Sequence, residues 1–124
     1  MERYLLNIGN TRCAVASGEV TNASPVWYCA GDEVTEVWRP QGEWRAVVSC
    51  VVPKIREALA GKWGKRIHFI GASDYPEVDF TAYDWERLGT DRMANAAAAR
   101  RLLTGQKVIV ADCGTALNTV TVDE

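Results

Sequence analysis

Short apolar runs separated by Gly, Pro and Asn divide the first half of the chain into predicted strands. Residues 3–17 read as two strands around a turn, and residues 26–30 and 44–52 read as two more. A short helix is predicted among the polar residues around 32–38. The first half is therefore expected to contribute most of a sheet.

A helix is predicted after the run 44–52, which Pro53 stops. Pro53 suits the first turn of a helix, where its missing N–H group costs nothing. In the segment that follows, Ile55, Leu59 and Trp63 recur with a spacing of four and lie on one apolar face. The spacing predicts that this face packs against the sheet.

The second half continues the alternation of strands and helices. A strand is predicted at 67–70, and a helix at 91–103 contains five Ala residues, which favour a helix that packs closely on a sheet. Two strands, 108–111 and 116–122, end the chain. This order predicts an α/β fold whose sheet mixes antiparallel hairpins with parallel crossovers.

Two turns between predicted strands carry residues suited to binding phosphate. Residues 7–11 read Asn-Ile-Gly-Asn-Thr, and residues 112–115 read Asp-Cys-Gly-Thr. Gly lets the backbone approach an oxyanion, backbone N–H groups and the Thr hydroxyl donate to it, and Asp can hold a cation. Each turn alone is also ordinary hairpin chemistry. Because this pattern occurs twice in one short chain, we interpret the two turns as binding the two sides of a nucleotide's phosphate chain.

The segment 88–92, Leu-Gly-Thr-Asp-Arg, opens the Ala-rich helix. Thr90 or Asp91 can be a simple N-cap. In the functional interpretation, the helix N-terminus attracts an anion, Arg92 adds a forked donor and Asp91 is a general base. Both interpretations stay open on these residues alone.

The composition of the chain excludes several classes of protein. At 124 residues, with a formal net charge of −2 and no clustered basic face, we expect one domain that binds no nucleic acid. No apolar run reaches the length of a membrane span and no signal segment follows Met1, so we expect a soluble, cytoplasmic protein.

The four cysteines and the single histidine are too dispersed for a zinc site or a disulfide framework. Cys13 and Cys50 are expected to be small buried hydrophobes. Cys113 is also expected to be inert packing, with a reactive thiol in the turn as the alternative. His68 is expected on the polar side of a strand, without a catalytic role.

Taken in order, residues 7–11, 88–92 and 112–116, with the Ser-Cys-Val-Val-Pro of 49–53, resemble type III pantothenate kinase, the family that includes the Bvg accessory factor proteins. The resemblance implies a ribonuclease H-like lobe of the actin-like ATPase superfamily, with a mixed β-sheet and flanking helices. It implies transfer of a phosphoryl group from ATP to pantothenate, giving 4'-phosphopantothenate in the first step of coenzyme A synthesis. It also implies Mg²⁺, a monovalent cation (K⁺ or NH₄⁺) and a homodimer.

The resemblance also assigns roles to individual residues. Asp91 matches the catalytic base, Arg92 binds pantothenate, and Asp112 holds the cation. The remaining substrate contacts are Gly89, Thr90 and Tyr83. The ATP phosphates fall to Asn7, Gly9, Asn10 and Thr11 in the first turn and to Gly114 and Thr115 in the second.

The chain departs from the family pattern at several positions. Asn7 replaces an Asp that helps to hold the metal, and Asn118 and Val120 stand where the pattern Ala-x-Thr-x-Asp has Thr and Asp. The segment that leads from Tyr83 to Asp91 lacks the usual Pro and is one residue short. We expect residues 1–124 to form one N-terminal lobe, with the second lobe absent and little kinase activity alone. The alternative is a non-catalytic binding or dimerisation protein, associating through a face that carries some of the five Trp residues.

Overall fold

The computed structural model describes residues 1–17, 26–81, 88–114 and 116–124. Its contacts divide the chain into two compact units, Met1–Ile70 and Gly71–Glu124, each with its own core. Two predicted site residues, Tyr83 and Thr115, lie outside the described residues. The expectation of a single ribonuclease H-like lobe stays a prediction.

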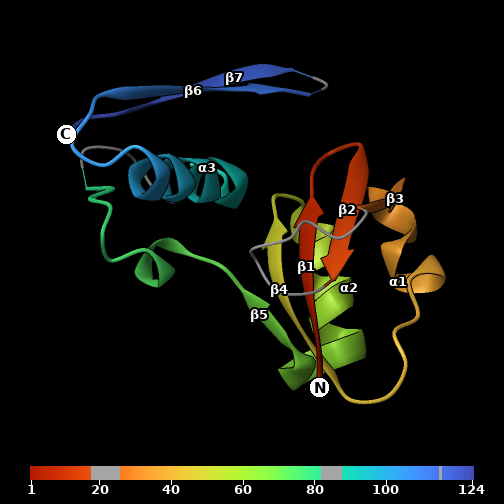
Figure 1. Cartoon of the computed structure of the whole chain (residues 1–124). Coiled ribbons are helices and arrows are strands. Elements are labelled where there is room, and N and C mark those ends of the chain that lie inside the picture. The colour runs from red at the N-terminus through yellow and green to blue at the C-terminus, as the bar shows by residue number, and fades with distance from the viewer. Residues whose placement is uncertain (18–25, 82–87, 115) are drawn as a thin grey trace. The chain divides into compact units, whose positions relative to one another are not determined.

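The first unit is built on a five-stranded sheet with the strand order β3-β2-β1-β4-β5 (Figure 1). The strands are β1 (Glu2–Ile8), β2 (Arg12–Ser17), β3 (Trp27–Ala30), β4 (Trp44–Cys50) and β5 (Ile67–Phe69). β1, β2 and β3 pair antiparallel in sequence order, whereas β4 lies parallel to both β1 and β5. The predicted mixture of hairpins and parallel crossovers is therefore confirmed.

Short helical segments and one longer helix connect these strands. The predicted helix around 32–38 is a 3₁₀ turn, η1 (Gly31–Glu33), followed by the single turn α1 (Val34–Val37). The helix α2 (Pro53–Trp63) begins at its proline, as predicted, and a 3₁₀ turn, η2 (Gly64–Arg66), leads into β5. Leu59 on α2 is completely buried, so its predicted apolar face is confirmed.

Aromatic rings occupy one end of the core of the first unit. Trp38, Trp44 and Trp63 meet edge to face with ring centroids 5.1–5.8 Å apart, and Tyr4 joins them on Trp38 at 5.2 Å. This edge-to-face geometry is favourable for aromatic pairs. Most of the described Trp side chains thus belong to the core, whereas Trp27 is 43% exposed. An association face that carries Trp residues stays a prediction.

In the described part of the second unit, a helix packs on a two-stranded hairpin (Figure 1). A 3₁₀ turn, η3 (Ala72–Asp74), precedes α3 (Thr90–Leu102), and the hairpin strands are β6 (Val108–Cys113) and β7 (Leu117–Val122). The alanines at 96, 97 and 99 are buried, which brings the helix close to the strands, as the composition predicts. The core also includes Phe80, Met93 and Val122.

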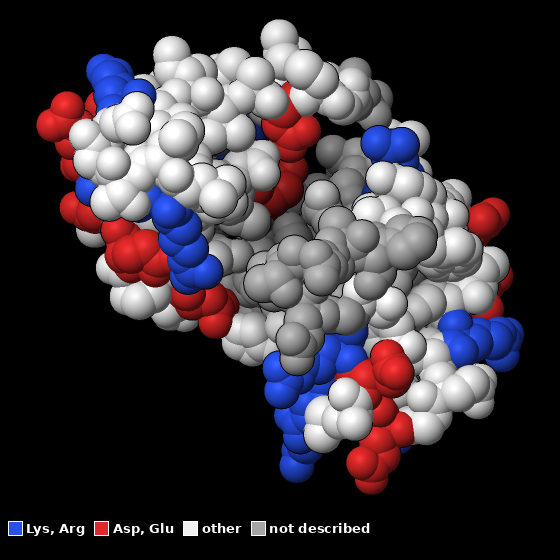
Figure 2. All heavy atoms as spheres, in the orientation of Figure 1, with Lys and Arg blue, Asp and Glu red and all other residues white. Residues whose placement is uncertain are grey.

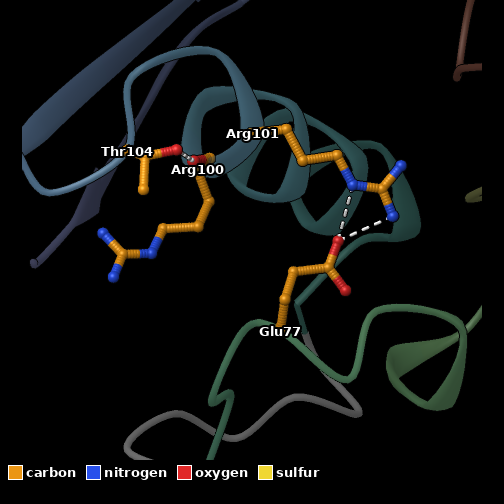
Figure 3. Close-up of polar contacts among 4 residues, drawn as sticks. All are labelled: Glu77, Arg100, Arg101 and Thr104. Atoms are coloured by element: carbon orange, nitrogen blue, oxygen red, sulfur yellow. Dashed lines mark hydrogen bonds and ion pairs between the residues drawn. The ribbon is translucent and has the colours of Figure 1, made fainter.

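An ion pair ties the segment before α3 to the end of that helix. Arg101 donates from Nε to Glu77 Oε1 at 2.7 Å, and its Nη2 lies 2.7 Å from the same oxygen (Figure 3). Figure 3 also shows the Arg100 guanidinium pointing away from this pair, while Thr104 donates a hydrogen bond to the Arg100 carbonyl. Val78 and Phe80, which follow Glu77 in the chain, pack in the small core.

Charged side chains of both signs are scattered over the face of the molecule in Figure 2. Acidic and basic groups lie beside one another there, as the nearly balanced composition leads one to expect. Among the described residues, no helix is long and apolar enough to cross a membrane.

Candidate functional site

The first predicted phosphate turn is narrower than the sequence indicates. Asn7 and Ile8 belong to β1, where Asn7 pairs with Ala14 on one side and Ser49 on the other. Only residues 9–11 form the turn, closed by a hydrogen bond of 3.0 Å from the Gly9 N–H to the Arg12 carbonyl. The Gly9 N–H is thus already donated within the turn, while the side chains of Asn7, Asn10 and Thr11 are exposed.

Gly31 packs against this turn, a role that the sequence did not predict. Its N–H donates to the Thr11 carbonyl at 3.3 Å. A Cβ on Gly31 would lie 3.2 Å from the Gly9 carbonyl oxygen, closer than side chains normally approach. Residue 31 must therefore be small for the turn to keep its position, and the signal for it was a Gly immediately after a predicted strand.

The second predicted turn is also shorter than expected. β6 continues through Asp112 and Cys113, so Asp112 lies in the strand and pairs directly with Asn118 on β7. The Gly114 N–H donates to the Ala116 carbonyl at 3.2 Å and closes the turn. Cys113 is exposed, so the expectation that it packs as an inert residue was wrong.

The predicted burial of Cys13 and Cys50 and the predicted place of His68 on the polar side of a strand are confirmed. Cys13 and Cys50 are buried. Burial raises the pKa of the Cys13 thiol to about 12, with further contributions from the neighbouring Cys29 and Cys50. Burial also raises the pKa of Cys50, although hydrogen bonding with the backbone of Val52 opposes the shift. His68 lies exposed on β5.

The start of α3 combines a glycine cap with two charged side chains. The N-cap is Gly89, whose carbonyl accepts from the backbone N–H groups of Arg92 and Met93 at 3.0 and 3.3 Å. The helix begins at Thr90, so the alternative in which Thr90 or Asp91 is the cap was wrong. The Asp91 carboxylate accepts from the Arg92 backbone N–H at 2.9 Å and is half-buried at the first turn.

Polar contacts join this end of α3 to the hairpin. Arg92 donates from Nη2 to Asn118 Oδ1 at 2.6 Å, and Asn95 donates from Nδ2 to Asp112 Oδ2 at 3.1 Å. Arg92 and Asn95 are three residues apart and share a helix face. The structure therefore brings Arg92 and Asp112 onto one polar contact surface, whereas the residues of the first turn belong to the first unit.

A cavity of about 540 Å³ opens beside Arg92 within the second unit. Phe80, Leu88 and Val120 give it apolar walls, and Arg92 and Arg100 line it two turns apart along α3. The lining also includes four acidic residues, Glu77, Asp79, Asp123 and Glu124. Apolar walls with a few charged groups are typical of sites for small polar molecules. Among the described residues, no three His, Cys, Asp or Glu side chains gather as a metal cage.

A comparison with protein-family models assigns the chain to a family. The model described as type III pantothenate kinase matches residues 4–124, which include both turns and the start of α3. The chain belongs to the type III pantothenate kinase family. No curated protein matches the chain.

For this member of the type III pantothenate kinase family, the sequence indicated the charged residues of the contact surface but not the amides that bind them. It treated Asn118 only as a departure from the family pattern and did not consider Asn95 at all. The i, i+3 spacing of Arg92 and Asn95 was a usable signal. The partners of these two side chains could not be predicted from the sequence, because they depend on how the hairpin packs on the helix.

Proposed function

We propose that this kinase transfers the γ-phosphoryl group of ATP to the hydroxyl of pantothenate, giving 4'-phosphopantothenate. Membership of the family supports the reaction class. The observation that carries the proposal is the polar contact surface of the second unit, where Arg92 at the start of α3 is bonded to the hairpin that carries Asp112. A charged donor, a carboxylate and a cavity are the parts that binding and phosphorylating a small acid requires.

Asp91 is the general base in this proposal, and Arg92 binds the carboxylate of pantothenate. Phosphoryl transfer asks mainly for positioning and charge stabilisation, so a single carboxylate that accepts the hydroxyl proton suffices. The Arg92 guanidinium suits a carboxylate ligand because its N–H groups form a planar fork. Gly89, Thr90 and Tyr83 complete the pantothenate contacts.

The ATP phosphates are assigned to Asn7, Gly9, Asn10 and Thr11, and to Gly114 and Thr115. The N–H groups of Gly9 and Gly114 close their own turns, and the side chains of Asn10 and Thr11 are exposed. We therefore expect the Asn10 and Thr11 side chains to matter more than the two glycine N–H groups.

Asp112 is the residue that would hold Mg²⁺, and its chemistry fits that ion. Mg²⁺ commonly binds one or two protein carboxylates together with substrate phosphates and water, so a single half-buried carboxylate is a reasonable contribution. When bound, the ion offsets charge on the phosphates. A monovalent cation, K⁺ or NH₄⁺, the homodimer and the ribonuclease H-like fold of one N-terminal lobe are parts of the same proposal.

Calorimetric titration of the purified chain with Mg-ATP and then with pantothenate, in potassium buffer, tests this function. We expect both ligands to bind, Arg92→Gln to weaken pantothenate, and Asp112→Asn to weaken Mg-ATP. Ile109→Thr is the control, because Ile109 is 69% exposed on the outer face of the hairpin. If neither ligand binds at millimolar concentration, the proposal fails.

The second candidate is a non-catalytic, Bvg accessory factor-like protein that binds a partner or dimerises. Asn7 in place of a metal-binding Asp favours it, as does Leu117, which is 68% exposed on the hairpin. Sedimentation across a concentration series tests this candidate. Association without binding of Mg-ATP or pantothenate would support this candidate. A monomer at all concentrations would refute this candidate and also the homodimer of the first proposal, whereas ligand binding would still support the kinase reaction.

A further inference from the structure

Polar side chains form a closed set between α3 and the hairpin. Asp112 and Asn118 are direct partners across β6 and β7, and both are half-buried. Opposite them, Arg92 and Asn95 lie one turn apart on α3. The contacts are Arg92 with Asn118 at 2.6 Å and Asn95 with Asp112 at 3.1 Å. Each charged group is thus bonded to a neutral amide from the opposite element.

This pairing has a chemical consequence for Arg92. A carboxylate partner would fix the guanidinium and also neutralise it, whereas an amide oxygen fixes it and leaves its full charge. Asn118 stands where the family pattern has Thr. An Asn side chain carries a carbonyl acceptor on a longer arm, and here that acceptor reaches across to the helix.

The hydrogen bond between Asn95 and Asp112 supports the one between Arg92 and Asn118. Asn95 binds Asp112, which is held beside Asn118 by the strand register, so the hairpin cannot slide along α3 without breaking both hydrogen bonds. The contact that Arg92 makes with Asn118 is therefore supported by a second hydrogen bond between the same two elements. Arg92 is also one of the residues that line the cavity.

We propose that Asn118 is a positioning residue that holds the charged Arg92 guanidinium in the direction needed to bind a carboxylate substrate. This inference rests on the proposed function for the identity of that substrate, pantothenate. The residue that departs from the family pattern is then part of the substrate site.

Matched variants separate the contribution of the hydrogen bond from that of charge. Asn118→Leu keeps the size of the side chain and removes the acceptor. Asn118→Asp keeps an acceptor and adds the negative charge that the amide avoids. Ile109→Thr changes the outer face of the same hairpin and is the control, since Ile109 is exposed.

The first readout is the NMR signal of the Arg92 side chain in protein labelled with ¹⁵N-arginine. A guanidinium held by a hydrogen bond rotates slowly and its Nη protons exchange slowly. We expect this restraint in the wild type, in Asn118→Asp and in Ile109→Thr, and its loss in Asn118→Leu. Equal restraint in Asn118→Leu would overturn the proposal.

The second readout is the dissociation constant for pantothenate, measured beside that for Mg-ATP. A hydrogen bond to a charged group is worth about tenfold or more in affinity, so we expect Asn118→Leu to weaken pantothenate by that factor. Asn118→Asp should weaken it as well, because its carboxylate neutralises Arg92. Mg-ATP affinity should change less than twofold in both variants.

Two outcomes would contradict the positioning role. Unchanged pantothenate affinity in Asn118→Leu would refute it directly. If Asn118→Leu lowers the affinity for both ligands equally and also lowers the thermal stability, Asn118 is only a structural residue. If the wild-type chain binds no pantothenate, the proposed function fails. In that case the NMR signal of the guanidinium alone decides whether Asn118 holds Arg92.

Discussion

Replacing Gly31 with Ala tests how closely the first turn is supported. The new Cβ would lie 3.2 Å from the Gly9 carbonyl oxygen and 3.6 Å from Ile55 Cδ1, so the turn must move by a few tenths of an ångström. Gly31 does not have a positive φ, so Ala can adopt its backbone conformation. Overpacking costs about 1–3 kcal/mol, and the lower entropy of the unfolded chain returns about 0.4–1 kcal/mol. We expect a net loss of stability of up to about 2.6 kcal/mol.

Gly61→Ala is the matched control, because it is the same substitution in the same unit. Gly61 lies on α2 with no atom within 4 Å of an added Cβ, so Ala should stabilise the helix by about 1 kcal/mol. Urea unfolding followed by the fluorescence of the buried Trp cluster measures both variants. If Gly31→Ala is stabilised as much as Gly61→Ala, the carbonyl of Gly9 does not restrict residue 31 and the reasoning is refuted.

Other predictions concern the core, an ion pair and the thiols. Leu59→Ala, at a fully buried position, should lower the free energy of unfolding by about 2–5 kcal/mol in the same urea assay, and a loss below 1 kcal/mol would contradict its central place. The pKa of Glu77 is lowered first by a hydrogen bond from its own backbone N–H and then by Arg101. The Glu77 carboxylate therefore contributes to stability above the pKa that it has in the unfolded chain. This contribution is lost as the pH falls through the lower pKa that it has in the folded protein. Arg101→Gln should raise the pKa of Glu77 only part of the way to its ordinary value, as measured by NMR titration. A complete return to the ordinary value would show that the backbone N–H contributes nothing. Thiol labelling of the native protein at pH 8 should modify exposed Cys113 first and Cys13 last, because burial raises the pKa of Cys13 to about 12; the reverse order would exclude this burial pattern.

The sequence predicted which elements form but not where the turns begin. Apolar periodicity located α2 and the strands of the first unit because these patterns depend on burial alone. Both turns were predicted too wide, since Asn7 and Asp112 are polar residues of low strand propensity. Pairing across the sheet outweighs that propensity, because Asn7 has strand partners on both sides and Asp112 pairs with Asn118.

The candidate site was predictable only in part for a related reason. The residues of the helix start and the turns could be named from residue type and order. The contact between Arg92 and Asn118 spans 26 residues of sequence and depends on the packing of α3 on the hairpin. A single sequence records no such pairing, so Asn118 reads as a loss until its acceptor is seen beside the guanidinium.

The topology of the two units has a consequence for how fast each forms. In the second unit, α3 is followed directly by the hairpin that it covers, so its contacts join residues near in sequence. In the first unit, β1 forms its parallel ladder with β4, which joins residues 2–8 to residues 44–50. Closing so long a loop carries an entropic cost before any contact compensates for it, and such pairings slow folding. During refolding, the helix–hairpin unit should therefore gain hydrogen-exchange protection before the central strand of the sheet does.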